Sequence, residues 1–261
     1  MMEAKNLQLS KKTNEVSFKD RFNLVEISDF LGKNAYQQLK NSYPKEDYFS
    51  NQTEFAKSLN DKSSEFHTFL QNSNIWNEFI EEINSEIFVN DLIKFFKIKN
   101  VYFANNNWRR FIPFYKQVKL HFSFNISKNG GYSLPHTDGS RKLVALVFFF
   151  VDKAWTFKNG GYVNLYKPIN PLYEDNWRNE RVDKKNLEII KRIIPQENKM
   201  YGFKKTVNSY HSVEPVVEIN SLDRKVLMIN LIYKNINDAP YEKNTLLNKI
   251  LIKLNIFFKS N

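Results

Sequence analysis

The residues of this chain best suited to chemistry are a histidine and a carboxylate two positions apart, His136 and Asp138, just after a glycine turn at Gly130-Gly131. In an extended segment, residues i and i+2 point to the same side. The imidazole and the carboxylate would therefore be presented side by side as a chelating pair. Such a pair can hold a metal ion if a third ligand reaches it.

The third ligand has to come from another part of the chain. Of the four histidines, we predict that His211 supplies it, although it lies 75 positions after His136 (211 − 136). Two histidines and one carboxylate on one face of an iron leave open positions for a bidentate ligand and oxygen. We expect His67 to be unrelated to chemistry, while the polar face around His121 is predicted either to line the mouth of a barrel or to be a hydrated outer face.

A basic group follows the last histidine. Arg224 precedes the apolar run 226–232, which is typical of a buried strand. The planar guanidinium matches the two oxygens of a carboxylate, so we expect Arg224 to bind an acidic group, with the adjacent Lys225 as the fallback.

In combination, these motifs resemble the iron(II)- and 2-oxoglutarate-dependent dioxygenases of the prolyl 4-hydroxylase-like group. The resemblance covers about residues 116–233 and rests on motifs that follow one another in the family's order. They are the glycine turn with Tyr132 before His136-x-Asp138, Phe150-Val151-Asp152 with Trp155, Gly160-Gly161 before a strand, Ser209-Tyr210-His211-x-Val213-x-Pro215, and Arg224.

The resemblance implies a double-stranded β-helix (jelly roll) with the metal in its mouth. His136, Asp138 and His211 would hold Fe(II), and Arg224 would bind the distal carboxylate of 2-oxoglutarate. A tyrosine often assists that arginine in the family, but the matching position here is Phe149. We expect Tyr132 or a residue of the strand 118–125 to replace it.

The resemblance also implies the reaction. The enzyme would hydroxylate an unactivated C–H bond with O2, release succinate and CO2, and use ascorbate as a reductant. Asp138 favours hydroxylation, because related halogenases lack this carboxylate. The substrate is predicted to be either a peptidyl residue of the prolyl type or a small molecule.

Two alternatives remain open at this point. One is a jelly-roll binding module that has lost catalysis, which the intact triad argues against. The other is an oxygenase acting on nucleic acid. Such enzymes carry a second arginine on the last strand, whereas Met228 and Asn230 follow Arg224 on its face.

Composition sets wider bounds. The 261 residues carry a formal charge of +11 and include no cysteine, which excludes disulfides and thiolate metal sites. The lysines are dispersed, so the charge is weak support for a nucleic-acid partner. The chain has neither a secretory signal nor an apolar run of membrane-spanning length, and we expect a cytoplasmic protein.

The elements that would position the site form one α+β domain with a mainly β core, over residues 16–261 after a flexible start at 1–15. Strands are expected at 22–27, 116–125, 143–151, 162–166 and 226–232, with a support helix at 75–98. A charged insert, 167–199, would carry a helix over 177–194 and form either a lid or a solvated surface. Residues 244–259 have the apolar spacing of a C-terminal helix.

Overall fold

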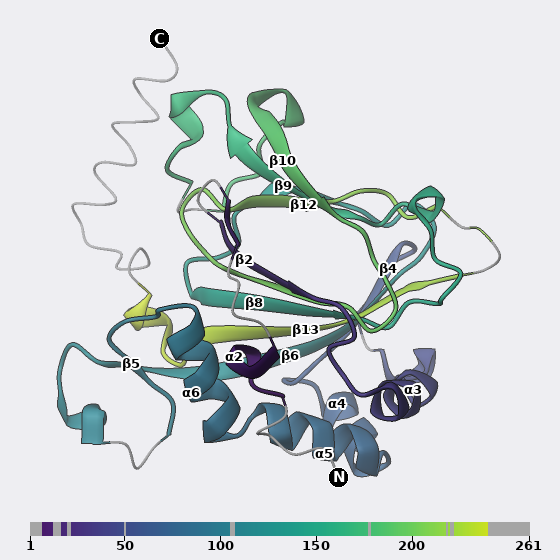
Figure 1. Ribbon diagram of the computed structural model, residues 1–261, viewed down its shortest axis with the longest axis horizontal. Coiled ribbons are helices and arrows are strands. Elements are labelled where there is room, and N and C mark those ends of the chain that lie inside the picture. Colours follow the sequence, from purple (N-terminus) through teal and green to yellow (C-terminus); the bar gives the residue numbers. More distant parts are fainter. Residues whose placement is uncertain are drawn as a thin grey trace.

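The computed structural model shows two facing β-sheets with helices behind the larger one (Figure 1). It describes residues 7–12, 17–19, 22–49, 51–104, 108–176, 179–217, 219 and 222–239. No helix within these ranges is both long and apolar enough to cross a membrane.

The large sheet forms the floor of the fold. Its strands pair antiparallel, apart from the short β5, which pairs with β6 in parallel. In spatial order they are β1 (Ser17–Lys19), β2 (Phe22–Ile27), β11 (Met200–Lys204), β8 (Lys142–Phe149), β13 (Arg224–Tyr233), β6 (Lys116–Ser127), β4 (Ala56–Asn60) and β3 (Asn51–Gln52), with β5 (Val101–Tyr102) beside β6.

The small sheet covers one face of the large sheet. It consists, in spatial order, of β10 (Leu187–Ile193), β9 (Val163–Pro168), β12 (Tyr210–Val213) and β7 (Ser133–His136). Figure 1 shows β9, β10 and β12 lying across from β8 and β13, the arrangement of a jelly roll. The fold class predicted from the sequence is confirmed.

Strand β8 lies at the centre because both of its faces are apolar, as the sequence predicts. Val144, Leu146 and Phe148 join the outer core, which lies between the large sheet and the helices. Ala145, Val147 and Phe149 join the inner core, which lies between the two sheets. The inner core is therefore the wall against which the candidate site is built.

Helices cover the outer face of the large sheet. The predicted support helix is two helices, because the chain breaks at Asn84-Ser85 and the hydroxyl of Ser85 accepts a hydrogen bond from Phe88 N to cap the second one. The helices are α2 (Leu9–Lys12), α3 (Lys33–Asn41), α4 (Ser64–Gln71), α5 (Asn74–Ile83) and α6 (Glu86–Phe95), and the short 3-10 turns are η1 (Glu46–Tyr48), η2 (Trp108–Phe111), η3 (Phe157–Asn159), η4 (Pro171–Tyr173), η5 (Lys184–Asn186) and η6 (Ile236–Asp238).

Other predictions differ from the structure at the ends and in the insert. Residues 7–12 are not loosely attached, since Leu7 and Leu9 are buried in the outer core. The helix predicted over 177–194 is wrong: its second half is strand β10, which pairs with β9 through a bulge. Isoleucines at 189, 190 and 193 favour a strand over a helix. The helix predicted over 244–259 lies outside the described residues.

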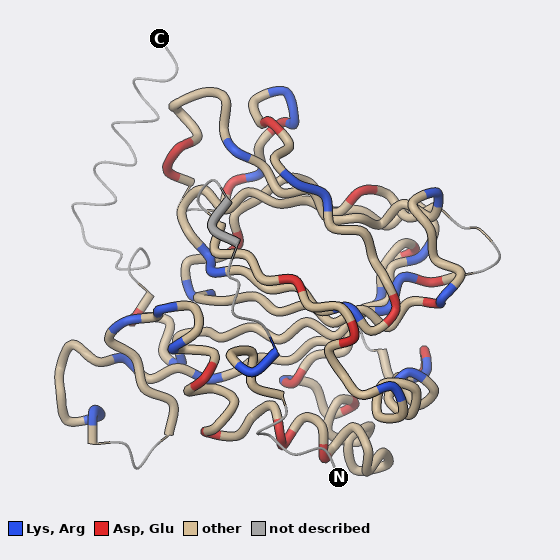
Figure 2. The backbone as a smooth tube through the Cα atoms, in the orientation of Figure 1, with Lys and Arg blue, Asp and Glu red and all other residues tan. Residues whose placement is uncertain are grey.

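Charged residues are spread over the described part of the chain. Figure 2 shows Lys and Arg on helices, strands and loops, mixed with Asp and Glu rather than gathered into one stripe. The dispersal that the sequence suggests is thus also present in space.

Candidate active site

The two histidines meet across a strand pair. His136 ends β7, His211 lies on β12, and the two residues are direct partners in the antiparallel ladder. Their ring centroids are 4.4 Å apart. Long-range pairing of the small sheet therefore brings together residues that are far apart in sequence.

Asp138 joins them from the loop after β7. Its backbone is left-handed, with φ 71°, so the chain turns at this residue instead of continuing as a strand. One carboxylate oxygen, Oδ1, lies 3.7 Å from Nε2 of His136, and the other, Oδ2, lies 3.6 Å from Nε2 of His211. Candidate ligand atoms of the three residues all lie within 4.8 Å of one another.

The hydrogen bonds around the three side chains fit a bound metal ion. Nδ1 of His136 lies 2.8 Å from the carbonyl oxygen of Leu134, and Nδ1 of His211 lies 3.1 Å from that of Ser209. Each bond turns Nε2 toward Asp138, as is usual for metal-binding histidines. Oδ2 of Asp138 is buried and has no hydrogen-bond partner among the described residues, so it is free to accept a cation.

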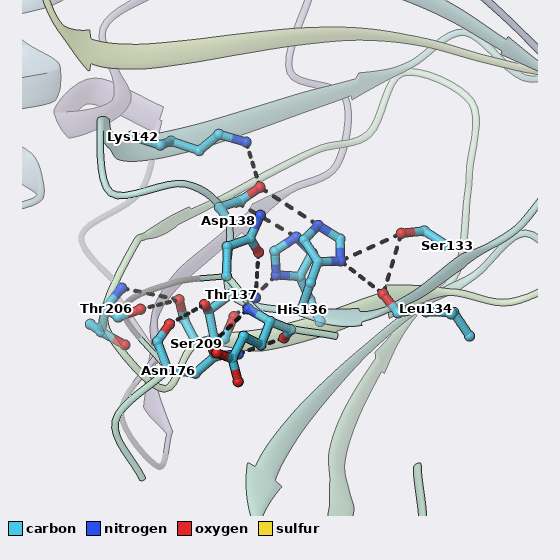
Figure 3. Close-up of polar contacts among 12 residues, drawn as sticks. Ser133, Leu134, His136, Thr137, Asp138, Lys142, Asn176, Thr206 and Ser209 are labelled. Atoms are coloured by element: carbon cyan, nitrogen blue, oxygen red, sulfur yellow. Dashed lines mark hydrogen bonds and ion pairs between the residues drawn. The ribbon is translucent and has the colours of Figure 1, made fainter. Parts of the chain in front are cut away.

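Lys142 supplies a positive charge at the other carboxylate oxygen. Its Nζ lies 2.8 Å from Oδ1 of Asp138, and Figure 3 shows the side chain reaching from β8 to the carboxylate. Burial acts to raise the pKa of Asp138, but the positive charge of Lys142, together with the interactions with His211 and His136, outweighs it and holds this pKa well below its ordinary value. Burial lowers the pKa of His211 to about 4, so its imidazole is neutral near pH 7 and can act as a ligand.

The insert 167–199 holds Thr137, the residue between His136 and Asp138. Thr137 is fully buried; its hydroxyl donates to the carbonyl of Asn176 at 2.7 Å, and its backbone N–H donates to Oδ1 of Asn179 at 3.2 Å. The amide of Asn176 is in turn bonded to the backbone of Glu180. The loop after η4 therefore fixes the backbone that carries His136 and Asp138 (Figure 3).

Arg224 lies at the start of β13 and is only 5% exposed. Its Nε donates a 2.8 Å hydrogen bond to the carbonyl of Gly161, and its Cζ lies 5.4 Å from the centre of the Phe149 ring. Burial lowers the pKa of Arg224 from its very high ordinary value. A buried guanidinium whose other nitrogens have no hydrogen-bond partner among the described residues is suited to bind an anion.

Gly161 makes room for Arg224, and we expect Gly161→Ala to displace it. The glycine has φ 62°, and a methyl group there would lie 2.8 Å from Cδ of Arg224. The left-handed backbone alone costs an alanine roughly 1–2 kcal/mol, which lowers the melting temperature by several degrees. Thermal unfolding of the variant measures this loss. Gly32→Ala is the control, because its added methyl group meets nothing within 4 Å. If both changes lower the melting temperature equally, Gly161 is not needed to make room for Arg224.

The remaining residues singled out in the sequence lie in different surroundings. Tyr132 is 62% exposed. His121 is paired with Asp61 on the face of β6 that is turned away from the helices. Lys225 lies on the opposite face of the large sheet, toward the helices, with its Nζ 5.8 Å from the centre of the Tyr43 ring. It therefore points away from Arg224.

Sequence reasoning missed Lys142. It follows Asp138 at i+4, which is a local signal. It does not stand out without knowing that the start of β8 lies beside the cluster.

Comparison with known proteins gives one family match. Residues 122–228 match the family model of the 2OG-Fe(II) oxygenase superfamily. No curated protein matches the sequence.

Solved structures resemble the fold at low identity. A prolyl 4-hydroxylase from Phytophthora capsici is 16% identical with a TM-score of 0.59, over 92% of this chain and 68% of that chain. A Trichoplax adhaerens prolyl hydroxylase in complex with a hypoxia inducible factor peptide fragment is 14% identical with a TM-score of 0.48, over 92% and 95% of the two chains. HygX from Streptomyces hygroscopicus, with nickel and 2-oxoglutarate bound, is 10% identical with a TM-score of 0.48, over 81% and 82%. The Phytophthora likeness bears on the fold alone.

The matched segment runs from within β6 into β13 and includes the three clustered side chains and Arg224. The fold is a jelly roll, and the cluster has the donor set of a ferrous site. Residues 122–228 are thus similar to the 2OG-Fe(II) oxygenase superfamily, and the cluster and Arg224 both lie within this matched segment.

Proposed function

We propose that the chain is an Fe(II)- and 2-oxoglutarate-dependent dioxygenase that uses O2 to hydroxylate an unactivated C–H bond and releases succinate and CO2. His136, Asp138 and His211 hold Fe(II), and Arg224 binds the distal carboxylate of 2-oxoglutarate. The observation that carries the proposal is the convergence of these three side chains, with all ligand atoms within 4.8 Å. When bound, the iron and 2-oxoglutarate supply the oxidative chemistry, while the protein supplies geometry and exclusion of water.

The residues of the chain prepare the site in three ways. The carbonyls of Leu134 and Ser209 orient the two imidazoles. Lys142 holds one oxygen of Asp138 and leaves the other for the ion. The inner core, with Phe149 and Phe203 beside the site, keeps water from the space between the metal ligands and Arg224.

For the substrate, we propose a peptidyl residue of the prolyl type. Tyr132 and Leu134 are exposed next to His136, and they offer an apolar surface on which an extended chain can lie. The polar face of β6 that carries His121 and Asn125 is turned away from the helices and offers hydrogen-bond partners. A small molecule is the other candidate, and the insert that fixes Thr137 is then the segment that selects it.

The decisive experiment measures succinate formed from 2-oxoglutarate by the full chain. Added Fe(II) should start slow turnover without substrate, and the correct peptide should accelerate it and gain oxygen in mass spectrometry. Peptides with and without proline, and a panel of small 2-oxoglutarate oxygenase substrates, separate the two substrate classes. A protein that binds neither iron nor 2-oxoglutarate would be a binding module instead.

A further inference from the structure

Tyr201 is a buried tyrosine whose hydroxyl has no hydrogen bond among the described residues. The residue lies on β11 and is 4% exposed. Its ring packs in the inner core, with its centroid 5.6 Å from that of Phe149 and 6.5 Å from that of Phe203. The hydroxyl oxygen is not among the fully enclosed side-chain atoms that lack a partner, so it reaches open space in which a ligand can be its partner.

The position of Tyr201 suggests where that partner belongs. Phe149, its neighbour on β8, lies against the Arg224 guanidinium. Phe203, its neighbour along β11, lies against His211, with ring centroids 4.9 Å apart. Tyr201 thus occupies the wall between the arginine and the metal-ligand cluster.

Electrostatics agrees with this placement. Burial raises the pKa of Tyr201, the charge of Arg224 opposes the increase, and the charge of Asp138 adds to it. Glu26, the cross-strand partner of Tyr201 on β2, also raises this pKa, so Tyr201 lies within the electrostatic reach of Arg224, Asp138 and Glu26. At ordinary pH its hydroxyl keeps its proton and is a donor.

We propose that the Tyr201 hydroxyl donates a hydrogen bond to the distal carboxylate of 2-oxoglutarate, beside Arg224. It replaces, from the neighbouring strand, the hydroxyl that Phe149 lacks. The inference rests on the proposed function, because it needs 2-oxoglutarate to lie between the iron ligands and Arg224. It assigns the second anchor to β11 rather than to Tyr132, which is largely exposed.

The test compares two ligands on two proteins. Tyr201→Phe removes one oxygen and keeps the ring. Binding is measured by calorimetry without oxygen on the Ni(II)-loaded protein, with 2-oxoglutarate and with 2-oxopentanoate, which has the same chain length but no distal carboxylate. A hydrogen bond to a charged group predicts that 2-oxoglutarate binds about 10- to 100-fold more weakly to the variant. Binding of 2-oxopentanoate should stay the same.

Tyr36→Phe is the matched control. Tyr36 is also buried, but its hydroxyl bonds to the carbonyl of Phe149 at 3.3 Å and its ring packs in the outer core. This variant should bind both ligands as the wild type does. If Tyr201→Phe leaves 2-oxoglutarate binding unchanged, or weakens both ligands equally, the assignment is wrong.

A second measurement covers the case in which Tyr201→Phe fails to fold. The ultraviolet absorption of tyrosine in the Ni(II)-loaded wild type should shift on adding 2-oxoglutarate and not on adding 2-oxopentanoate. Equal shifts with both ligands would overturn the proposal. Failure of the wild type to bind 2-oxoglutarate at all would instead overturn the proposed function.

Discussion

Asp138→Ala should abolish iron-dependent succinate formation while the protein stays folded. Asp138 is the one carboxylate of the cluster, and the two neighbouring imidazoles carry no negative charge to balance a dication. Removing even an outer partner of a metal ligand costs about 10–100-fold in affinity or activity, so loss of a ligand should cost more. Iron content after desalting, succinate formation and thermal unfolding measure the three expectations.

The control for this change is Asp91→Asn. Asp91 is also a buried aspartate, but it lies on α6 and bonds to Ser10, on the helix side of the large sheet. It should keep iron binding and turnover. Full activity in Asp138→Ala would show that this carboxylate is not an iron ligand.

The architecture was largely predictable because β8 has an unambiguous local pattern. An apolar run rich in valine and phenylalanine has no polar face, so it must be covered on both sides, and the outer and inner cores cover it. The alternation in β6 likewise predicted a strand with one apolar face. Such patterns lie within a few residues, so they survive without knowledge of tertiary contacts.

The candidate site was predicted for a reason that is only partly right. The spacing of His136 and Asp138 suggested one continuous extended segment. In the structure β7 ends at His136, and Asp138 reaches the cluster because its left-handed backbone turns the chain. Pairing with His211 depends on strand register across the small sheet, which sequence spacing does not encode.

The insert and Tyr201 show what local reasoning cannot supply. The spacing of Leu187, Ile190 and Ile194 fits a helix. In the structure, however, β12 pairs with only one edge of β9, and the segment rich in β-branched residues pairs with the other edge as β10. Tyr201 gains its meaning only because β11 lies beside β8, where Phe149 faces Arg224. Both facts concern neighbours in the sheet rather than neighbours in the chain.

Arg224→Ala should raise the 2-oxoglutarate requirement with little effect on iron binding. The guanidinium is buried, its bond to Gly161 fixes it beside Phe149, and it is not one of the three clustered side chains. Losing one partner of a buried, hydrogen-bonded charge pair costs about 2–5 kcal/mol, which is roughly a 30- to several-thousand-fold weaker affinity. The concentration of 2-oxoglutarate giving half-maximal succinate formation measures this loss, and calorimetry without oxygen confirms that binding is the affected step.

Two companion variants show whether the shape of the guanidinium or its charge is what matters. Arg224→Lys keeps a positive charge but loses the planar fork, so it should recover only part of the affinity. Lys225→Ala removes the next charge along the chain, which lies over the Tyr43 ring on the helix side of the sheet, and it should leave the requirement unchanged. If Lys225→Ala raises the requirement and Arg224→Ala does not, the distal carboxylate is bound from the opposite face, and the inner-core placement of 2-oxoglutarate is wrong.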